Sequence, residues 1–147
     1  MPSSPSTQLS PYLQFIGAYC LESDQQIVRY GLRLKAHHLN FFGAAHGGLI
    51  QSLHDAAMAQ LARNLHLDQK AALTLQMQTY FLEVAGALDE ELVVEATLQH
   101  QSLTLVVCAA VCLWRGEVVA RSTAQFKLVK LQRQNLARLR RNPAEEV

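Results

Sequence analysis

Apolar positions in this chain follow a repeat of two, then a helical repeat, then a repeat of two again. In residues 27–35, apolar residues alternate with basic ones, which is typical of a strand with one buried face. Residues 46–65 are rich in Ala, Leu, Met and Gln, and their large aliphatic residues recur every three or four positions. Residues 11–20 are apolar and fit a short helix that leads into a strand. The pattern predicts one long helix between strands.

Four strands joined by short turns are expected after the long helix. The first has an apolar face made of Leu73, Leu75, Met77, Thr79 and Phe81. Another follows after residues 86–91, and residues 103–114 form a third strand that is apolar on both faces. Arg115-Gly116 is a tight hairpin turn before the last strand, residues 117–129. The apolar face of that last strand consists of Val118, Ala120, Ala124, Phe126 and Leu128.

Short turns favour antiparallel neighbours, so these elements predict an α+β domain. One long helix would pack against an antiparallel sheet of five or six strands. We place this domain in residues 11–130. Residues 1–10 are rich in Ser and Pro and are expected to be flexible, and residues 131–147 form a basic tail.

Composition narrows the function classes. The 147 residues are 50% hydrophobic and 17% charged, with a net charge of +1, so we expect no nucleic-acid partner. No apolar stretch approaches the roughly 18–20 residues of a membrane span, and the N-terminal residues do not resemble a signal peptide. The three cysteines are scattered, which favours buried reduced thiols. We therefore expect a cytoplasmic protein that does not contact membranes.

Residues 36–62 carry a single charge, Asp55, where the average composition predicts four or five. At 100° per residue, Asp55 falls nearly opposite the large aliphatic residues of the helix, beside Gln51, Ser52, Ala59 and Ala62. A face this small and uncharged is expected to be covered by a second subunit. A carboxylate in an interface between subunits is costly unless it has hydrogen-bond partners or a catalytic role. Asp55 is therefore either a catalytic carboxylate or a buried structural one.

The long helix begins after His46-Gly47-Gly48. Unpaired N–H groups at a helix start can bind a developing oxyanion, and glycine lets a substrate carbonyl approach closely. Asp55 lies about 10–12 Å further along the helix. Amide donors from one chain and a carboxylate from another would therefore meet more easily than two groups of one chain.

These residues resemble the hotdog-fold acyl-CoA thioesterases of the phenylacetate-pathway (PaaI-like) type. Asn40 is followed six residues later by His-Gly-Gly, and Asp55 lies nine residues after that His, as in the family pattern. A later family segment is similar to Thr74 with residues 81–85. The resemblance covers about residues 12–130, and it implies the hotdog fold, a long helix wrapped by an antiparallel sheet.

The resemblance also implies roles for individual residues. The Gly47 backbone N–H would polarise the thioester carbonyl, and Asp55 of the other subunit would be base or nucleophile. Thr74 would help place the attacking water, and Asn40 and His46 would shape the loop and the helix start. We assign substrate binding to Gly48, Ser52 and Met58. No metal or cofactor is expected, and the partners are an acyl-CoA and a second copy of the chain in a homodimer, possibly a dimer of dimers.

The chain departs from the family pattern at three positions. Glu83 and Val84 replace the usual Arg-Pro, and His54 precedes Asp55. We expect a neutral His54 that hydrogen-bonds across an interface. Hydrolysis of an acyl-CoA to free acid and coenzyme A is the expected function. A non-catalytic acyl-CoA-binding or regulatory hotdog module is the alternative.

Overall fold

The computed structural model describes residues 8–66 and 70–130. The predicted flexible N-terminus (apart from residues 8–10) and the predicted basic tail lie outside these ranges. In chain order the elements are α1 (Pro11–Ile16), β1 (Tyr19–Ser23), β2 (Ile27–Arg33), the 3-10 helix η1 (Ala36–His38), α2 (Gly47–Leu65), β3 (Lys70–Phe81), β4 (Glu91–Gln101), β5 (Leu105–Trp114) and β6 (Glu117–Lys130). This order agrees with the sequence prediction.

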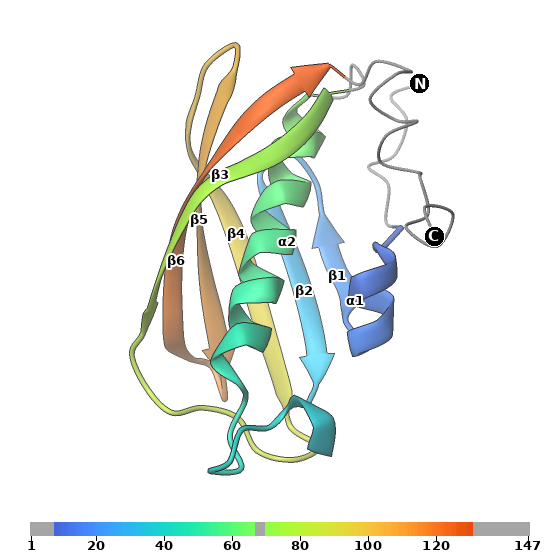
Figure 1. Cartoon of the computed structure of the whole chain (residues 1–147), viewed down its shortest axis with the longest axis vertical. Helices are drawn as coiled ribbons and strands as arrows, with labels where there is room; N and C mark the ends of the chain where they lie inside the picture. Colours follow the sequence, from blue (N-terminus) through green and yellow to red (C-terminus); the bar gives the residue numbers. More distant parts are fainter. Residues whose placement is uncertain (1–7, 67–69, 131–147) are drawn as a thin grey trace, which may run out of the picture.

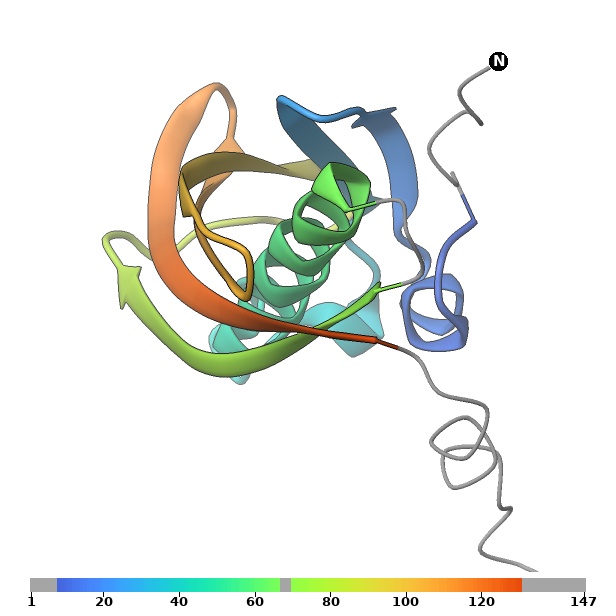
Figure 2. The same cartoon turned by 90° about the horizontal axis from the view of Figure 1, so that it is seen from above.

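The six strands form a single antiparallel sheet in the order β1-β2-β4-β5-β6-β3. The long helix α2 crosses one face of the sheet (Figure 1). Seen from above, the sheet curves around this helix (Figure 2). The predicted α+β architecture is confirmed. β1 and β3 are the two edge strands of the sheet. β3, which faces the Asp55 region of α2, therefore has one side without a neighbouring strand.

The core lies between α2 and the concave face of the sheet. Helix residues Leu53, Ala57, Met58 and Leu61 are completely or almost completely buried there. Of all the residues of α2, only Gly48 and Arg63 are exposed. The helix is therefore covered over most of its surface by its own chain, which explains the scarcity of charges in residues 36–62. Ala62, predicted to lie on the Asp55 face, is instead fully buried.

A β-bulge in β3 changes which side chains face the helix. The pairing with β6 shifts register between Thr74 and Gln76, leaving Leu75 as the extra residue. Leu73 and Leu75 are 51% and 57% exposed, so their predicted place on the apolar inner face is wrong. The residues that face α2 are Ala72 and Thr74 before the bulge and Met77, Thr79 and Phe81 after it.

The hairpin between β5 and β6 has the predicted turn. Arg115 and Gly116 both have positive φ, 53° and 76°, as in the tight turns that match the twist of paired strands. A second register shift follows, between Cys112 and Leu113. As a result, Val119 is buried on the inner face and Val118, which the alternation placed there, is only half-buried. Every second residue from Ala120 to Leu128 is buried.

Candidate functional site

The start of α2 is shaped by His46, its N-cap residue. The His46 Nδ1 accepts a hydrogen bond from the Gly48 N–H at 2.9 Å. The Gly47 N–H, by contrast, has no acceptor within the described part of the chain. A Cβ at Gly47 would lie 3.3 Å from the Phe81 ring of β3, which explains why glycine fits there. The helix therefore begins with one free amide donor beside an aromatic ring.

Asn40 organises the loop before the helix. Its Oδ1 accepts hydrogen bonds from the backbone N–H groups of Phe42 (2.9 Å) and Ala44 (3.1 Å). The loop is fixed at its far end because the His46 N–H donates to the His38 carbonyl. Asn40 thus braces the backbone that leads into α2.

Asp55 and Thr74 are brought together across the gap between α2 and β3. The Thr74 hydroxyl donates a hydrogen bond of 2.7 Å to Asp55 Oδ1. Asp55 is half-buried, and no described residue other than Thr74 bonds its carboxylate. Oδ2 is therefore open to a water or a substrate. This arrangement can hold a carboxylate in place while leaving one of its two oxygens without a hydrogen bond.

A cavity of about 240 Å³ lies beside Asp55, between α1 and α2. Its wall includes Ser52, Ala56 and Ala59 of α2 and Tyr30 of β2. It is large enough for several atoms of a small ligand. The carboxylate thus borders a cavity instead of facing bulk solvent.

The three predicted substrate-binding residues lie in different environments. Gly48 is exposed at the helix start, with its N–H bonded to His46. The Ser52 hydroxyl donates to the Gly48 carbonyl at 2.8 Å and lies 2.9 Å from the Tyr12 hydroxyl. Met58 is completely buried in the core, and its carbonyl accepts a hydrogen bond from the Cys108 thiol. Substrate contacts at these residues stay a prediction.

Gly47 and Asp55 belong to the same helix but lie far apart. Eight residues separate them, which is about 12 Å along the helix axis. A carbonyl bound at the Gly47 N–H of one chain therefore lies beyond the reach of a water held by Asp55 of the same chain. The predicted roles of Gly47 and Asp55 on one carbonyl would therefore need these two residues to come from different chains.

Behind Asp55, a buried polar network joins α2 to the sheet, and sequence reasoning missed most of it. His54 Nδ1 lies 2.5 Å from the Ser122 hydroxyl of β6, which in turn lies 2.8 Å from the Thr79 hydroxyl of β3. Gln51 Nε2 donates to Thr79 at 3.4 Å. His54 therefore bonds to its own sheet, not across an interface as predicted. One feature of the sequence could have predicted this network: Ser122 is a polar residue on the otherwise apolar face of the last strand.

His54 is fully buried, and its Nε2 has no partner in the part of the chain that the structure describes. Burial lowers the pKa of His54 to about 4. The imidazole is therefore neutral at ordinary pH, and its complete burial keeps it out of contact with solvent.

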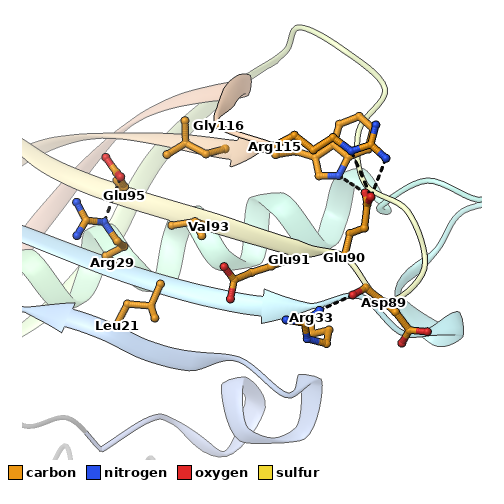
Figure 3. Close-up of a pocket in the computed structure, with 12 residues that line it drawn as sticks. Leu21, Arg29, Arg33, Asp89, Glu90, Glu91, Val93, Glu95, Arg115 and Gly116 are labelled. Carbon is orange, nitrogen blue, oxygen red and sulfur yellow. Dashed lines mark hydrogen bonds and ion pairs between the residues drawn. The ribbon is translucent and has the colours of Figure 1, made fainter.

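A separate hollow of about 640 Å³ lies on the other face of the sheet (Figure 3). Its arginines are already engaged, because Arg29 pairs with Glu95 at 3.1 Å and Arg115 with Glu90 at 2.7 Å. Arg33 donates to the Asp89 carbonyl (Figure 3). Two of its three arginines are thus paired with carboxylates, and the hollow shares no residue with the cavity beside Asp55.

Three other buried titratable groups, His38, Cys108 and Cys112, have surroundings that fit a structural role. His38 is buried, accepts from the Lys35 N–H and contacts the Ile16 carbonyl, and burial lowers its pKa. Cys108 and Cys112 are free and buried, and burial raises the pKa of each thiol to about 12. Within residues 8–66 and 70–130, no helix has the length and hydropathy to cross a membrane.

Comparisons with known proteins agree with this architecture. Residues 42–120, more than half of the chain, match the model of the thioesterase superfamily. A 102-residue region is 31% identical to a Deinococcus radiodurans protein whose name describes it only provisionally as an esterase. That region covers 69% of this chain and 66% of the relative, so the chain spans less than two thirds of that protein.

Two solved structures show the same fold. A mutant of the phenylacetic acid degradation protein PaaI from Thermus thermophilus is 21% identical, with a TM-score of 0.74 over 83% of this chain and all of that one. A hypothetical thioesterase from Streptococcus pneumoniae, solved with coenzyme A, is 22% identical, with a TM-score of 0.71 over 79% and 88% of the two chains. With its long helix wrapped by a six-stranded antiparallel sheet, this chain has the hotdog fold and belongs to the thioesterase superfamily.

Proposed function

We propose that this protein hydrolyses an acyl-CoA thioester to a free acid and coenzyme A, with Asp55 at the centre of the reaction. The contact between Asp55 and Thr74 beside a cavity is the observation that carries the proposal. Membership of the thioesterase superfamily supports the reaction type. The coenzyme A in the pneumococcal structure supports the leaving group.

In the general-base form of the reaction, Thr74 holds Oδ1 of Asp55 while Oδ2 takes a proton from water. The water oxygen then bonds to the thioester carbon, and the carbon–sulfur bond breaks. The proton passes from Asp55 to the sulfur, so that a carboxylic acid and a thiol are formed. In the alternative form, Asp55 attacks the carbonyl carbon itself, the carbon–sulfur bond breaks, and coenzyme A leaves as a thiolate. Water then cleaves the resulting anhydride to the free acid and the Asp55 carboxylate, and the proton released in this step converts the thiolate to the thiol.

We assign the oxyanion donor to the free Gly47 N–H of a second chain. Within one chain, Gly47 lies about 12 Å from Asp55 along α2, too far for both to act on one carbonyl. A twofold dimer would present the helix start of each chain to the Asp55 of the other and create two equivalent sites.

Exposed apolar side chains support a second copy of the chain on the β3 side. β3 is an edge strand with an unpaired side, and Leu73, Leu75 and Tyr80 on it are 51–57% exposed. Near the helix start, Phe41 and Phe42 are also exposed. Pairing two β3 edges would continue the sheet and cover these side chains.

Mixing two inactive variants tests the two-chain site. Asp55→Asn and Gly47→Pro are each expected to lose activity. If equal amounts are unfolded together and refolded, half of the dimers contain both variants and have one intact site of two. Activity should return to about a quarter of that of the wild type. A site within one chain predicts no recovery, because every chain then carries a defect.

A binding measurement separates hydrolysis from a non-catalytic acyl-CoA-binding module. Asp55→Asn should lower the rate at least ~10²-fold while calorimetry still detects an acyl-CoA. Wild-type protein that binds acyl-CoAs without releasing thiol would favour the binding module and contradict the proposal.

A further inference from the structure

The far end of the cavity beside Asp55 has a hydroxyl group and a guanidinium group that hydrolysis of a thioester does not require. Tyr30 of β2 is 3% exposed and lines the cavity, and its hydroxyl has no hydrogen-bond partner among the described residues. This hydroxyl is not one of the fully buried polar atoms that lack a partner, so it keeps some accessible surface at the cavity, where a ligand can contact it. Burial raises the pKa of Tyr30 to about 12, and the hydroxyl therefore keeps its proton at neutral pH.

Arg63 lines the same cavity two turns of α2 beyond Asp55. Its guanidinium donates to the Gln60 side chain at 2.5 Å. Within residues 8–66 and 70–130, no carboxylate pairs with it. Tyr30 lines the same cavity, and the Arg63 charge acts to lower the pKa of Tyr30 against the larger effect of burial. The arginine therefore offers a permanent positive charge and several N–H donors at this end of the cavity.

The wall between the two ends is mostly polar. Only Leu13, Ala56 and Ala59 contribute purely apolar side chains. Tyr12, Ser52 and Gln60 already bond within the chain. A long alkyl chain would, however, displace water from the Tyr30 hydroxyl and the Arg63 guanidinium without replacing its hydrogen bonds, which is costly. The cavity thus disfavours a fatty acyl chain and favours a short group with acceptor oxygens.

We propose that this cavity holds the acyl group of the substrate and selects short acyl groups that end in a carboxylate, which Tyr30 and Arg63 bind. This inference rests on the proposed thioesterase activity at Asp55. The thioester carbonyl lies at the Asp55 end, and the terminal carboxylate lies at the Arg63 end. The Asp55 charge repels that carboxylate while Arg63 attracts it, so the two charges fix the direction in which the acyl group enters.

The spacing sets the length of the acyl group. Asp55 and Arg63 are separated by about 12 Å along α2, and side chains of a helix lean toward its N-terminus, which brings Arg63 closer to Asp55. Because the Arg63 side chain is long and leans toward Asp55, we take a dicarboxylic acyl group of about six carbons as the length to test. Adipyl-CoA and hexanoyl-CoA are therefore suitable probes, because they differ only at the terminal carbon.

The test compares kcat/KM for these two probes. Wild-type protein should prefer adipyl-CoA at least tenfold. Tyr30→Phe and Arg63→Gln should each shift the ratio of the two values toward one. Arg33→Gln is the matched control, since Arg33 lies on the other face of the sheet and its loss should leave the ratio unchanged (Figure 3). A wild-type ratio of one or below, or a ratio that neither variant changes, overturns the inference.

A binding arm keeps this inference separate from the proposed function. Thioether analogues of both probes, in which CH₂ replaces the thioester carbonyl, bind without reacting. Tighter binding of the carboxylated analogue, lost in Arg63→Gln, supports the cavity assignment even if no acyl-CoA is hydrolysed, in which case the proposed function alone fails. Hydrolysis of both probes without preference, and equal binding of both analogues, leaves the thioesterase proposal standing and rejects the carboxylate site.

Discussion

The Thr74 hydroxyl lies 2.7 Å from Asp55 Oδ1, although nineteen residues separate them in the chain. Asp55 lies in the middle of α2, and Thr74 lies just before the bulge in β3. In an uninterrupted strand, Thr74 and Thr79 would point to opposite faces. The extra residue Leu75 lets both face the helix, one toward Asp55 and the other toward the network behind it.

Removing the Thr74 hydroxyl should slow hydrolysis. Thr74→Val keeps the shape of the side chain but deletes the donor to Asp55. A hydrogen bond to a charged group is worth about 1.5–3 kcal/mol, so kcat should fall roughly ten- to a hundredfold. Thr74→Ser is the matched control and should keep most of the rate. Equal rates for the Val and Ser variants would exclude this contact from the mechanism.

Deleting the Gly47 N–H should be tolerated by the fold and harmful to catalysis. Proline is compatible with the first position of a helix, and His46 before it already has the extended conformation, ψ 134°, that a following proline requires. Gly47→Pro should lower kcat by roughly 10²–10³-fold. Gly47→Ala places a Cβ against Phe81 in the same way but keeps the N–H, and it should retain more activity. Similar losses in both variants would point to crowding by the side chain.

Stability should depend on pH through His54. Its folded pKa is about 4, whereas an exposed histidine has a pKa near 6.5, so between these values only the unfolded chain binds the proton. The free energy of unfolding therefore decreases as the pH falls from about 6.5 to 4, by about 3 kcal/mol in total. His54→Gln should remove this part of the dependence of the free energy of unfolding on pH. Denaturant titrations of both proteins at pH 7, 5.5 and 4.5 give the free energy of unfolding at each pH. An equal decrease with falling pH in the wild type and the variant would contradict the prediction.

A charge on the outer face of β3 should weaken the proposed dimer. Leu75 is 57% exposed, and Leu75→Lys should shift the population toward monomer in sedimentation experiments and lower the activity at low protein concentration. Leu103→Lys is the control, because Leu103 is also exposed but precedes β5 in the turn after β4. An unchanged mass for the Leu75 variant would place the interface elsewhere.

The candidate site could be predicted in part from the residues themselves. The isolated charge of Asp55 and the His46-Gly47-Gly48 start of the helix identified two elements, and the resemblance to a known family added Thr74 and Asn40. Ser122, Tyr30 and Arg63 were not identified. Tyr30 and Arg63 look ordinary in their own segments, since Tyr30 lies on an alternating strand and Arg63 lies in the last turn of a helix. Ser122 differs, because it is a polar residue on the apolar face of its strand.

Local patterns determined the elements of this protein, their order and the antiparallel connections, because periodicity, capping residues and short turns act between neighbours in the chain. The bulges in β3 and β6 could be located only from the paired strands. A shift of one residue reverses the faces of a strand and leaves little trace in composition. The cavity beside Asp55 was likewise decided only by tertiary structure. It combines residues of α1, β2 and α2 whose proximity depends on how the sheet wraps around the helix.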